Sequence, residues 1–386
     1  MEGFPLQLAR KLSEREAMNA LRSLKGLGGL VDFSSNDYLG LARNEAVSSW
    51  AGQLVTDAYP MRNGAAGSRL LTGNHKLYLD LESLLEQVYG APALVFNSGY
   101  DANMGFFASI PQRGDLVLYD EYVHASIRDG IRMGLAKGYK FRHNDLEDLQ
   151  LQLRRHNKTG NAAEVYVVTE SVFSMDGDSP RLHEMLAFCA GHDCRLVVDE
   201  AHALGVCGKG PVGLVQHLGL EKETFARILT FGKAMGAHGA AVVGSAPLKD
   251  YLVNFARSFV YTTALPPHAV ATLLGAYHYI VTESGNRQQQ KLLENVRFFR
   301  EQLALMDLQA YFTDSQSAIQ CCLLPGNSHV KEAAGYLQGN GFDVRPILSP
   351  TVPEGSERLR FCLHSFNSEN DIRAVLGRLV EFIKPK

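Results

Sequence analysis

The sequence predicts an α/β fold built on a mostly parallel sheet, followed by a smaller α+β domain. From about residue 76, short apolar runs bounded by polar turns alternate with helical stretches. Such alternation is typical of βαβ units, in which helices cover both faces of a parallel sheet. After about residue 275 the alternation stops, and a chain of 386 residues is long enough for two hydrophobic cores.

Six apolar runs are expected as strands of the larger sheet. They cover residues 93–96, 115–119, 165–169, 195–199, 228–231 and 240–244. An amphipathic helix is expected within residues 1–22, ahead of this region. The resulting division is an N-terminal segment over 1–45, a large α/β domain over 46–280 and a small α+β domain over 281–386.

The small domain is expected to begin with a long charged helix over residues 283–305. Strand patterns follow in SAIQCCLL, FDVRPIL and RLRFCLH. Ser368 is suited to cap the last helix, since a serine hydroxyl can accept a free backbone N–H there. The apolar residues of that helix form one stripe at helical spacing: Ile372, Leu376, Leu379 and Ile383.

Composition excludes several classes of protein. The net charge of −3 gives no basic excess for nucleic acid or an anionic membrane surface. No run of about 18 apolar residues predicts a membrane span, and the charged start of the chain is unlike a signal peptide. The six cysteines show no C-x-x-C spacing, so we expect reduced thiols, no metal site and a cytoplasmic protein.

Lys233 is the first candidate for chemistry. It follows a predicted strand in LTFGKAMGAHGA (229–240), where small neighbours leave room for a flat cofactor against the backbone. A lysine that forms a Schiff base needs such a setting, together with a lowered pKa. Taken alone, the segment favours an ordinary surface loop lysine over a cofactor lysine.

Asp199 and His202 lie in VVDEAHALG (197–205), at the end of the preceding predicted strand. A carboxylate at this edge of an open sheet can pair with a protonated pyridine nitrogen, and His202 could reach the ring oxygen. Asp199 could instead cap the helix that follows. A helicase reading of D-E-A-H fails, because no G-x-x-x-x-G-K-[ST] loop lies upstream.

Further candidates follow other strands. In FNSGYDANMG (96–105) a helix begins where a phosphate could bind, with Gly99 and Tyr100 as its cradle and Thr230 adding a hydroxyl. His124 could stack on an aromatic cofactor, and Ser174 could contact its ring oxygen. Each signal has a plain structural alternative, but parallel strands would bring all of them to one edge of the sheet.

These segments, in this order, resemble the α-oxoamine synthase family of fold-type-I pyridoxal-phosphate enzymes. The resemblance spans nearly the whole chain and is carried by FSSNDYLGL, GAAGSRLLTGNH, FNSGYDANMG, HASIRDG, HND, TESVFSMDGD, DEAHALG, TFGKAMG, YTTALPP and SPTVPEGSERLRF. It implies a mostly parallel seven-stranded sheet, pyridoxal 5'-phosphate as the cofactor, no metal, and a homodimer with shared active sites.

The resemblance also implies a role for each candidate. Lys233, His124 and Asp199 are catalytic. The implied cofactor-binding residues are Gly99, Tyr100, His124, Ser174, Asp199, His202, Thr230 and Lys233, with Thr262 and Thr263 directed to the partner subunit's cofactor. The implied substrate contacts are Arg22, Asn36, Ser68, Thr351 and Arg360. Arg360 is preferred to Arg358 for a substrate carboxylate, because Arg358 is expected to point to the opposite face of a strand.

Three features favour the biotin-pathway branch of the family: the short N-terminal stretch, Ser68 and the motif SRLLTGNH. The expected reaction joins L-alanine to a pimeloyl thioester, carried by coenzyme A or a carrier protein, with loss of CO₂ and of the thiol. The alternatives are a synthase that uses glycine or serine, an aminotransferase or lyase, and a silent subunit. The presence of Lys233 argues against the last.

Overall fold

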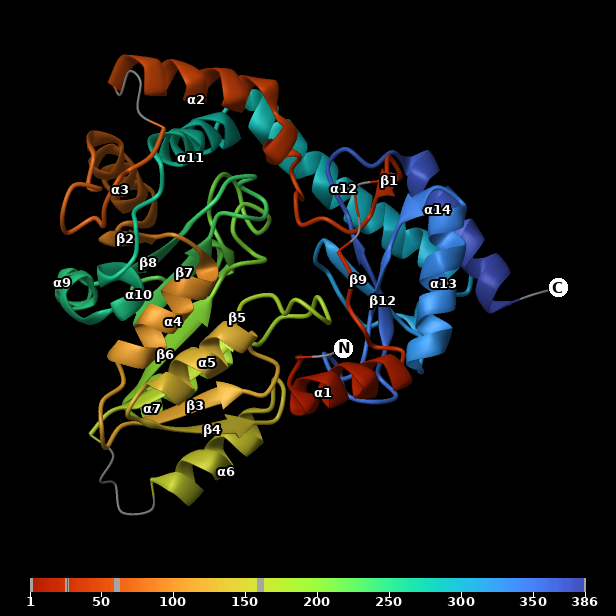
Figure 1. Ribbon diagram of the computed structural model, residues 1–386, viewed down its shortest axis with the longest axis horizontal. Helices are drawn as coiled ribbons and strands as arrows, with labels where there is room; N and C mark the ends of the chain where they lie inside the picture. Colours follow the sequence, from red (N-terminus) through yellow and green to blue (C-terminus); the bar gives the residue numbers. More distant parts are fainter. Residues whose placement is uncertain (1–2, 25, 27, 59–62, 158–162, 385–386) are drawn as a thin grey trace. The chain divides into compact units, whose positions relative to one another are not determined.

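The computed structural model describes residues 3–24, 26, 28–58, 63–157 and 163–384 (Figure 1). The chain divides into two compact units. The larger comprises residues 36–174 and 179–290, and the smaller contains the residues up to 35, 175–178 and those from 291. The domain boundaries expected at residues 45 and 280 stay a prediction. No described helix is long and apolar enough to cross a membrane.

Within the described residues, seven strands form the sheet of the larger unit, in the order β2-β8-β7-β6-β5-β3-β4. Their bounds are Ala93–Phe96 (β2), Leu116–Asp120 (β3), Lys137–Phe141 (β4), Val165–Glu170 (β5), Cys194–Asp199 (β6), Ala226–Thr230 (β7) and Ala240–Gly244 (β8). The pairs from β7 to β4 are parallel, and β8 runs against both of its neighbours. The predicted sheet is therefore confirmed, and β3, β5, β6 and β7 end at one edge.

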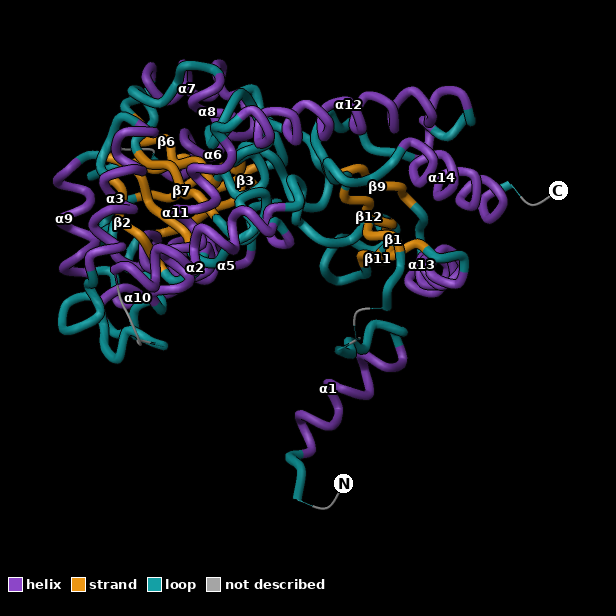
Figure 2. Tube along the Cα trace, turned by 90° about the horizontal axis from the view of Figure 1, so that it is seen from above, coloured by secondary structure: helices purple, strands orange, loops and turns teal. Residues whose placement is uncertain are grey.

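Helices cover both faces of this sheet, because residues along a strand alternate between its faces. In β5, Tyr166 and Val168 join a core under α4, α5, α9 and α10, whereas Val165 and Val167 face α6, α7 and α8. Figure 2 shows the strands between α7 and α8 on one side and α5 and α10 on the other. The bounds are Gly99–Ser109 (α4), Ala125–Met133 (α5), Leu146–His156 (α6), Leu182–Gly191 (α7), Leu214–His217 (α8), Ala246–Phe255 (α9) and Arg257–Val260 (α10).

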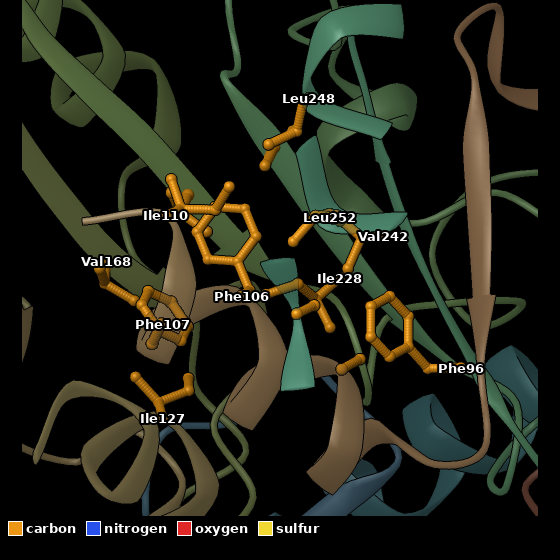
Figure 3. Close-up of a cluster of buried hydrophobic side chains, with 14 of the residues drawn as sticks. Phe96, Phe106, Phe107, Ile110, Ile127, Val168, Ile228, Val242, Leu248 and Leu252 are labelled. Atoms are coloured by element: carbon orange, nitrogen blue, oxygen red, sulfur yellow. The ribbon is translucent and has the colours of Figure 1, made fainter. Parts of the chain in front are cut away.

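The core under α4 fixes the helix that begins at the predicted phosphate cradle. Phe106 and Phe107 of α4 pack with Ile127 of α5 and Val168 of β5 (Figure 3). Burying large apolar side chains of this kind contributes about 1.5–3 kcal/mol each. The buried side chains in the second half of α4 therefore also hold the start of this helix against the sheet.

The rest of the larger unit consists of α2 (Glu45–Ala58), α3 (Lys76–Tyr89) and α11 (Pro267–Ile280). The smaller unit contains a three-stranded antiparallel sheet of β11 (Arg345–Ile347), β12 (Arg358–Cys362) and β9 (Ile319–Leu323), in that order. A two-residue pairing joins β1 (Val31–Asp32) to β10 (Phe342–Asp343). The α-helices of the smaller unit are α1 (Leu6–Ala17), α13 (Asn327–Gly339) and α14 (Glu369–Ile383). Helix α12 (Glu283–Leu305) begins in the larger unit and ends in the smaller one.

The cap of the last helix and the free thiols match the sequence predictions, whereas an aromatic cluster in the smaller unit was not predicted. Ser368 caps α14 by accepting the N–H of Asp371, whose carboxylate in turn accepts the N–H of Ser368. Phe33, Phe299, Phe312 and Phe361 form an aromatic cluster beside the antiparallel sheet. The six cysteines are free thiols, as expected.

A buried ion pair that the sequence does not reveal anchors the segment before α3. Arg69 contacts the carboxylate of Glu82, and both side chains are 9% exposed. Lys249 Nζ lies 2.9 Å from the same carboxylate, which also accepts the N–H of Val95 in β2. Glu82 therefore joins a loop, a helix and an edge strand through charge-assisted hydrogen bonds.

Replacing Glu82 by alanine is expected to lower the free energy of unfolding by about 3–5 kcal/mol, because it leaves a buried guanidinium without its partner. Asp80→Ala is the matched control, since Asp80 lies in the same helix but pairs with Lys76 at the surface. That change should stay within about 1 kcal/mol. Denaturant unfolding measures both, and equal losses would contradict the structural role of Glu82.

Candidate active site

The candidate site lies where β6 and β7 end. Asp199 is the last residue of β6 and Thr230 the last of β7, and His202 and Lys233 follow each by three residues. Lys233 Nζ lies 2.9 Å from His202 Nε2. The two turns therefore meet at the edge where open parallel sheets bind ligands.

Gly236 allows the Lys233 turn to approach the segment at residues 41 and 42. Its φ is 60°, and a Cβ at this position would lie 2.2 Å from the backbone nitrogen of Ala42. Its N–H donates to the carbonyl of Lys233 at 2.8 Å. A side chain here would push the lysine turn away from its neighbour, so glycine is required.

A chain of hydrogen bonds runs from Lys233 to Asn36. His202 Nδ1 lies 2.7 Å from the hydroxyl of Tyr38, which lies 3.1 Å from Asn36 Oδ1. The amide oxygen can only accept, so the tyrosine proton goes to Asn36 and His202 Nδ1–H donates to Tyr38. His202 Nε2 is then an acceptor for Lys233. All three bonds are satisfied by this one arrangement.

Asp199 is 4% exposed and has donors on both oxygens. Asn103 Nδ2 of α4 donates to Oδ2 at 2.9 Å, and the N–H of Ala201 donates to Oδ1 at the same distance. Asn103 also contacts Ser126 Oγ at 3.0 Å. Hydrogen bonds to a carboxylate favour its charged form. Asp199 is therefore suited to hold a cationic group.

His124 caps α5 and belongs to the same network. Its Nδ1 accepts the N–H of Ser126 and lies 2.8 Å from Ser126 Oγ, so a neutral ring carries its proton on Nε2. Desolvation lowers the pKa of His124 below its usual range, as does the charge of Lys233, while Asp199 opposes the shift. At pH 7 the ring is neutral and suited to stacking.

The predicted phosphate cradle brings Gly99 and Thr230 into contact. A Cβ at Gly99 would lie 2.4 Å from Thr230 Oγ1. Ser98 caps α4 by accepting the N–H of Asp101, so the N–H groups of Gly99 and Tyr100 are left for an anion. The Tyr100 hydroxyl is not counted in the cradle, because it donates to Asp129 at 2.7 Å.

Thr262 and Thr263 lie beside the cradle. Asn97, the residue after β2, donates to Thr262 Oγ1 at 3.1 Å and to the carbonyl of Thr263 at 2.7 Å. Ser68 accepts the N–H groups of Leu71 and Gly73 with its carbonyl in a tight turn. Ser174 is half-buried in the segment after β5.

The remaining predicted substrate contacts belong to the smaller unit. Arg22 donates to Thr351 Oγ1 at 3.1 Å, and both side chains are exposed. Arg358 contacts Asp176 and donates to the carbonyl of Met175, whereas Arg360 pairs across the sheet with Arg345 and Cys321. Residues two apart in a strand share a face. The expected opposite orientation of Arg358 and Arg360 is therefore wrong, and the choice of Arg360 as the substrate contact stays a prediction.

Sequence reasoning missed several residues that organise this site: Tyr38, Asn103, Ser126 and Glu170. A signal was present for Asn103, a polar residue inside the otherwise apolar run ANMGFFA. Tyr38 lies in the FSSNDYLGL segment, but a tyrosine beside apolar residues is more often part of a core.

The profile described as "Aminotransferase class I and II" matches residues 29–379. The chain belongs to this family. An 8-amino-7-oxononanoate synthase from Emericella nidulans is 37% identical over 98% of this chain and 95% of its own length. A serine palmitoyltransferase from S. paucimobilis, solved with a bound PLP-myriocin aldimine, has a TM-score of 0.87 at 27% identity, covering 97% of this chain and 96% of that one.

A solved 8-amino-7-oxononanoate synthase from Francisella tularensis has a TM-score of 0.77 at 28% identity and covers 92% of this chain and 98% of that one. These findings confirm the predicted fold-type-I, pyridoxal-phosphate-dependent class I and II enzyme. The residues fit this cofactor. A glycine cradle suits a phosphate, a buried carboxylate such as Asp199 suits a protonated ring nitrogen, and an amine such as that of Lys233 suits an aldehyde.

Gly99→Ala is expected to weaken cofactor binding on the order of tenfold, because the added methyl group would displace Thr230 from the cradle. Gly52→Ala in α2 is the control, since its Cβ would meet nothing within 4 Å. Cofactor titration followed by absorbance measures both dissociation constants. An unchanged constant for Gly99→Ala would remove the cradle from the site.

Proposed function

We propose that the chain condenses L-alanine with a pimeloyl thioester to give 8-amino-7-oxononanoate, CO₂ and the free thiol, a step of biotin biosynthesis. The observation that carries the proposal is the 37% identity, over 98% of the chain, to an enzyme of that name. The geometry supports the same chemistry, since a lysine amine, a buried carboxylate and an anion cradle lie at one edge of one sheet.

Each residue has a role in this proposal. The bound cofactor supplies an electron sink for the carbanion that forms when the substrate loses its α-proton. Lys233 Nζ takes that proton, and His202 Nε2 lies within hydrogen-bond distance of the amine. The Asp199 carboxylate holds the proton on the pyridine nitrogen. His124 stacks on the ring, and Gly99, Tyr100 and Thr230 bind the phosphate.

The substrate contacts are also proposals. Asn36 presents its amide nitrogen to the carboxylate of L-alanine, because its oxygen accepts from Tyr38. Ser68 is assigned to the amino-acid side chain. Arg22, Thr351 and Arg360 of the smaller unit, the contacts of Thr262 and Thr263 with the partner subunit's cofactor, and the homodimer rest on the family resemblance. The proposed acyl carrier is coenzyme A or a carrier protein.

A second candidate is an α-oxoamine synthase that uses glycine or serine, like 2-amino-3-ketobutyrate ligase or serine palmitoyltransferase. One observation favours it. The TM-score to a serine palmitoyltransferase is 0.87, against 0.77 for a solved 8-amino-7-oxononanoate synthase. The two reactions differ in the amino acid, so they can be separated directly.

The test is thiol release from pimeloyl-CoA by the cofactor-loaded protein, with L-alanine, glycine and L-serine compared side by side. Release that depends on L-alanine is expected. Release with glycine or serine instead would favour the second candidate. Conversion of L-alanine to pyruvate without any thioester would indicate an aminotransferase.

Lys233→Ala is expected to abolish thiol release, a loss of at least about 10⁴-fold, because the base and the covalent attachment both disappear. The variant should also lose the visible absorbance of lysine-bound cofactor. Lys209→Ala is the matched control, since Lys209 is an exposed lysine that also follows a glycine. Full activity in Lys233→Ala would contradict the assignment.

A further inference from the structure

A row of three acids ends neighbouring strands of the larger sheet. Asp120 ends β3, Glu170 ends β5 and Asp199 ends β6, and the three strands are adjacent in the order β6-β5-β3. The side chains are 0%, 3% and 4% exposed, respectively. A buried carboxylate stays charged only where it has compensating partners.

The two outer acids have such partners. Asp120 lies 2.9 Å from His143 Nδ1 and accepts the N–H groups of Tyr122 and Asn144. Asp199 accepts from Asn103 and from the N–H of Ala201.

The middle acid differs. Among the described residues, the Glu170 side chain has one hydrogen-bond donor, the backbone N–H of His124, which lies 2.6 Å from Oε1. Glu170 is also paired in register with Asp199 on the next parallel strand, so the two side chains project from the same face. When two carboxyl groups share a site, the one with fewer donors keeps its proton.

We propose that Glu170 is a neutral, protonated acid in the folded protein and that it positions His124 through the N–H that it accepts. The assignment of His124 to the cofactor ring rests on the proposed function, whereas the protonation of Glu170 does not. The consequence is that, of the in-register pair Glu170 and Asp199, only Asp199 carries a charge that could pair with the ring nitrogen.

The groups that act on Glu170 come from four elements, and Asp120 acts from the other face of the sheet, which it shares with Leu116 and Leu118. Asp199 on β6 and Asp120 on β3 add negative charge, and Lys233 after β7 adds positive charge. His124 at the start of α5 adds the N–H. Burial is the largest effect and raises the pKa of Glu170 to about 8, with Asp199 and Asp120 acting in the same direction and Lys233 opposing them.

Infrared difference spectroscopy of the full-length protein tests the protonation. A protonated carboxyl band, shifted in D₂O, is expected in wild-type minus Glu170→Gln spectra at pH 7. It should fall to half near pH 8. Glu200 is the comparison, because burial also raises its pKa, to about 7, and Glu200→Gln should remove a separate band. Glu164→Gln, before the opposite end of β5, should remove none.

The positioning role needs a second readout, the induced circular dichroism of the bound cofactor. Glutamine keeps an oxygen for the N–H of His124, so Glu170→Gln should retain the wild-type signal. Glu170→Leu removes the acceptor, and we expect a changed signal and cofactor binding weaker on the order of tenfold.

Two results would overturn the proposal: no carboxyl band that depends on Glu170 at pH 7, or a signal in Glu170→Gln as altered as in Glu170→Leu. If Glu170→Gln does not fold, the band is followed in wild-type and Glu200→Gln protein from pH 6 to 9.5, and its absence from both counts against the proposal. A failed thiol-release assay with the Glu170 band present would refute the proposed function alone.

Discussion

The burial of one negative charge, that of Asp199, organises the active-site edge of the larger unit. A carboxylate that is 4% exposed needs donors that the chain itself supplies. One donor, Asn103, lies on α4, four residues after the glycine that begins the phosphate cradle. Asn103 also contacts Ser126, which holds the ring of His124 on α5. One network therefore sets the positions of the three groups proposed to bind the phosphate, pair with the ring nitrogen and stack on the ring.

In the hydrogen-bond chain from Lys233 to Asn36, all donors point the same way. Since the amide oxygen of Asn36 can only accept, every proton in the chain points from the lysine toward the amide. His202 is thereby held with an unprotonated nitrogen facing the amine. A base that must accept a proton benefits from a neighbour that accepts hydrogen bonds from it and does not compete as a donor.

The predictable parts of the fold were those with strong local patterns. The buried strands are continuous apolar runs, and Ser368 lies immediately before an apolar stripe, so both could be located from the sequence. Strand β4 was not predicted, because it lies at the sheet edge and in its KGYKF only Phe141 is fully buried. Asn103 and Glu170 gained their roles from neighbours on other elements, and no spacing along the chain reveals such contacts.

The adjacent residues Asp199 and Glu200 show how one strand end serves both faces of the sheet. Alternation sends Asp199 toward α4, where the chemistry is expected, and Glu200 toward the opposite face. There Glu200 is fully buried and accepts the N–H of Val215, near the start of α8. Burial raises the pKa of Glu200 to about 7, and the charge of Arg227 on β7 opposes the shift. The acid on this second face holds the end of the loop that returns from His202, so the turn proposed to be catalytic depends on a carboxyl group on the opposite face of the sheet.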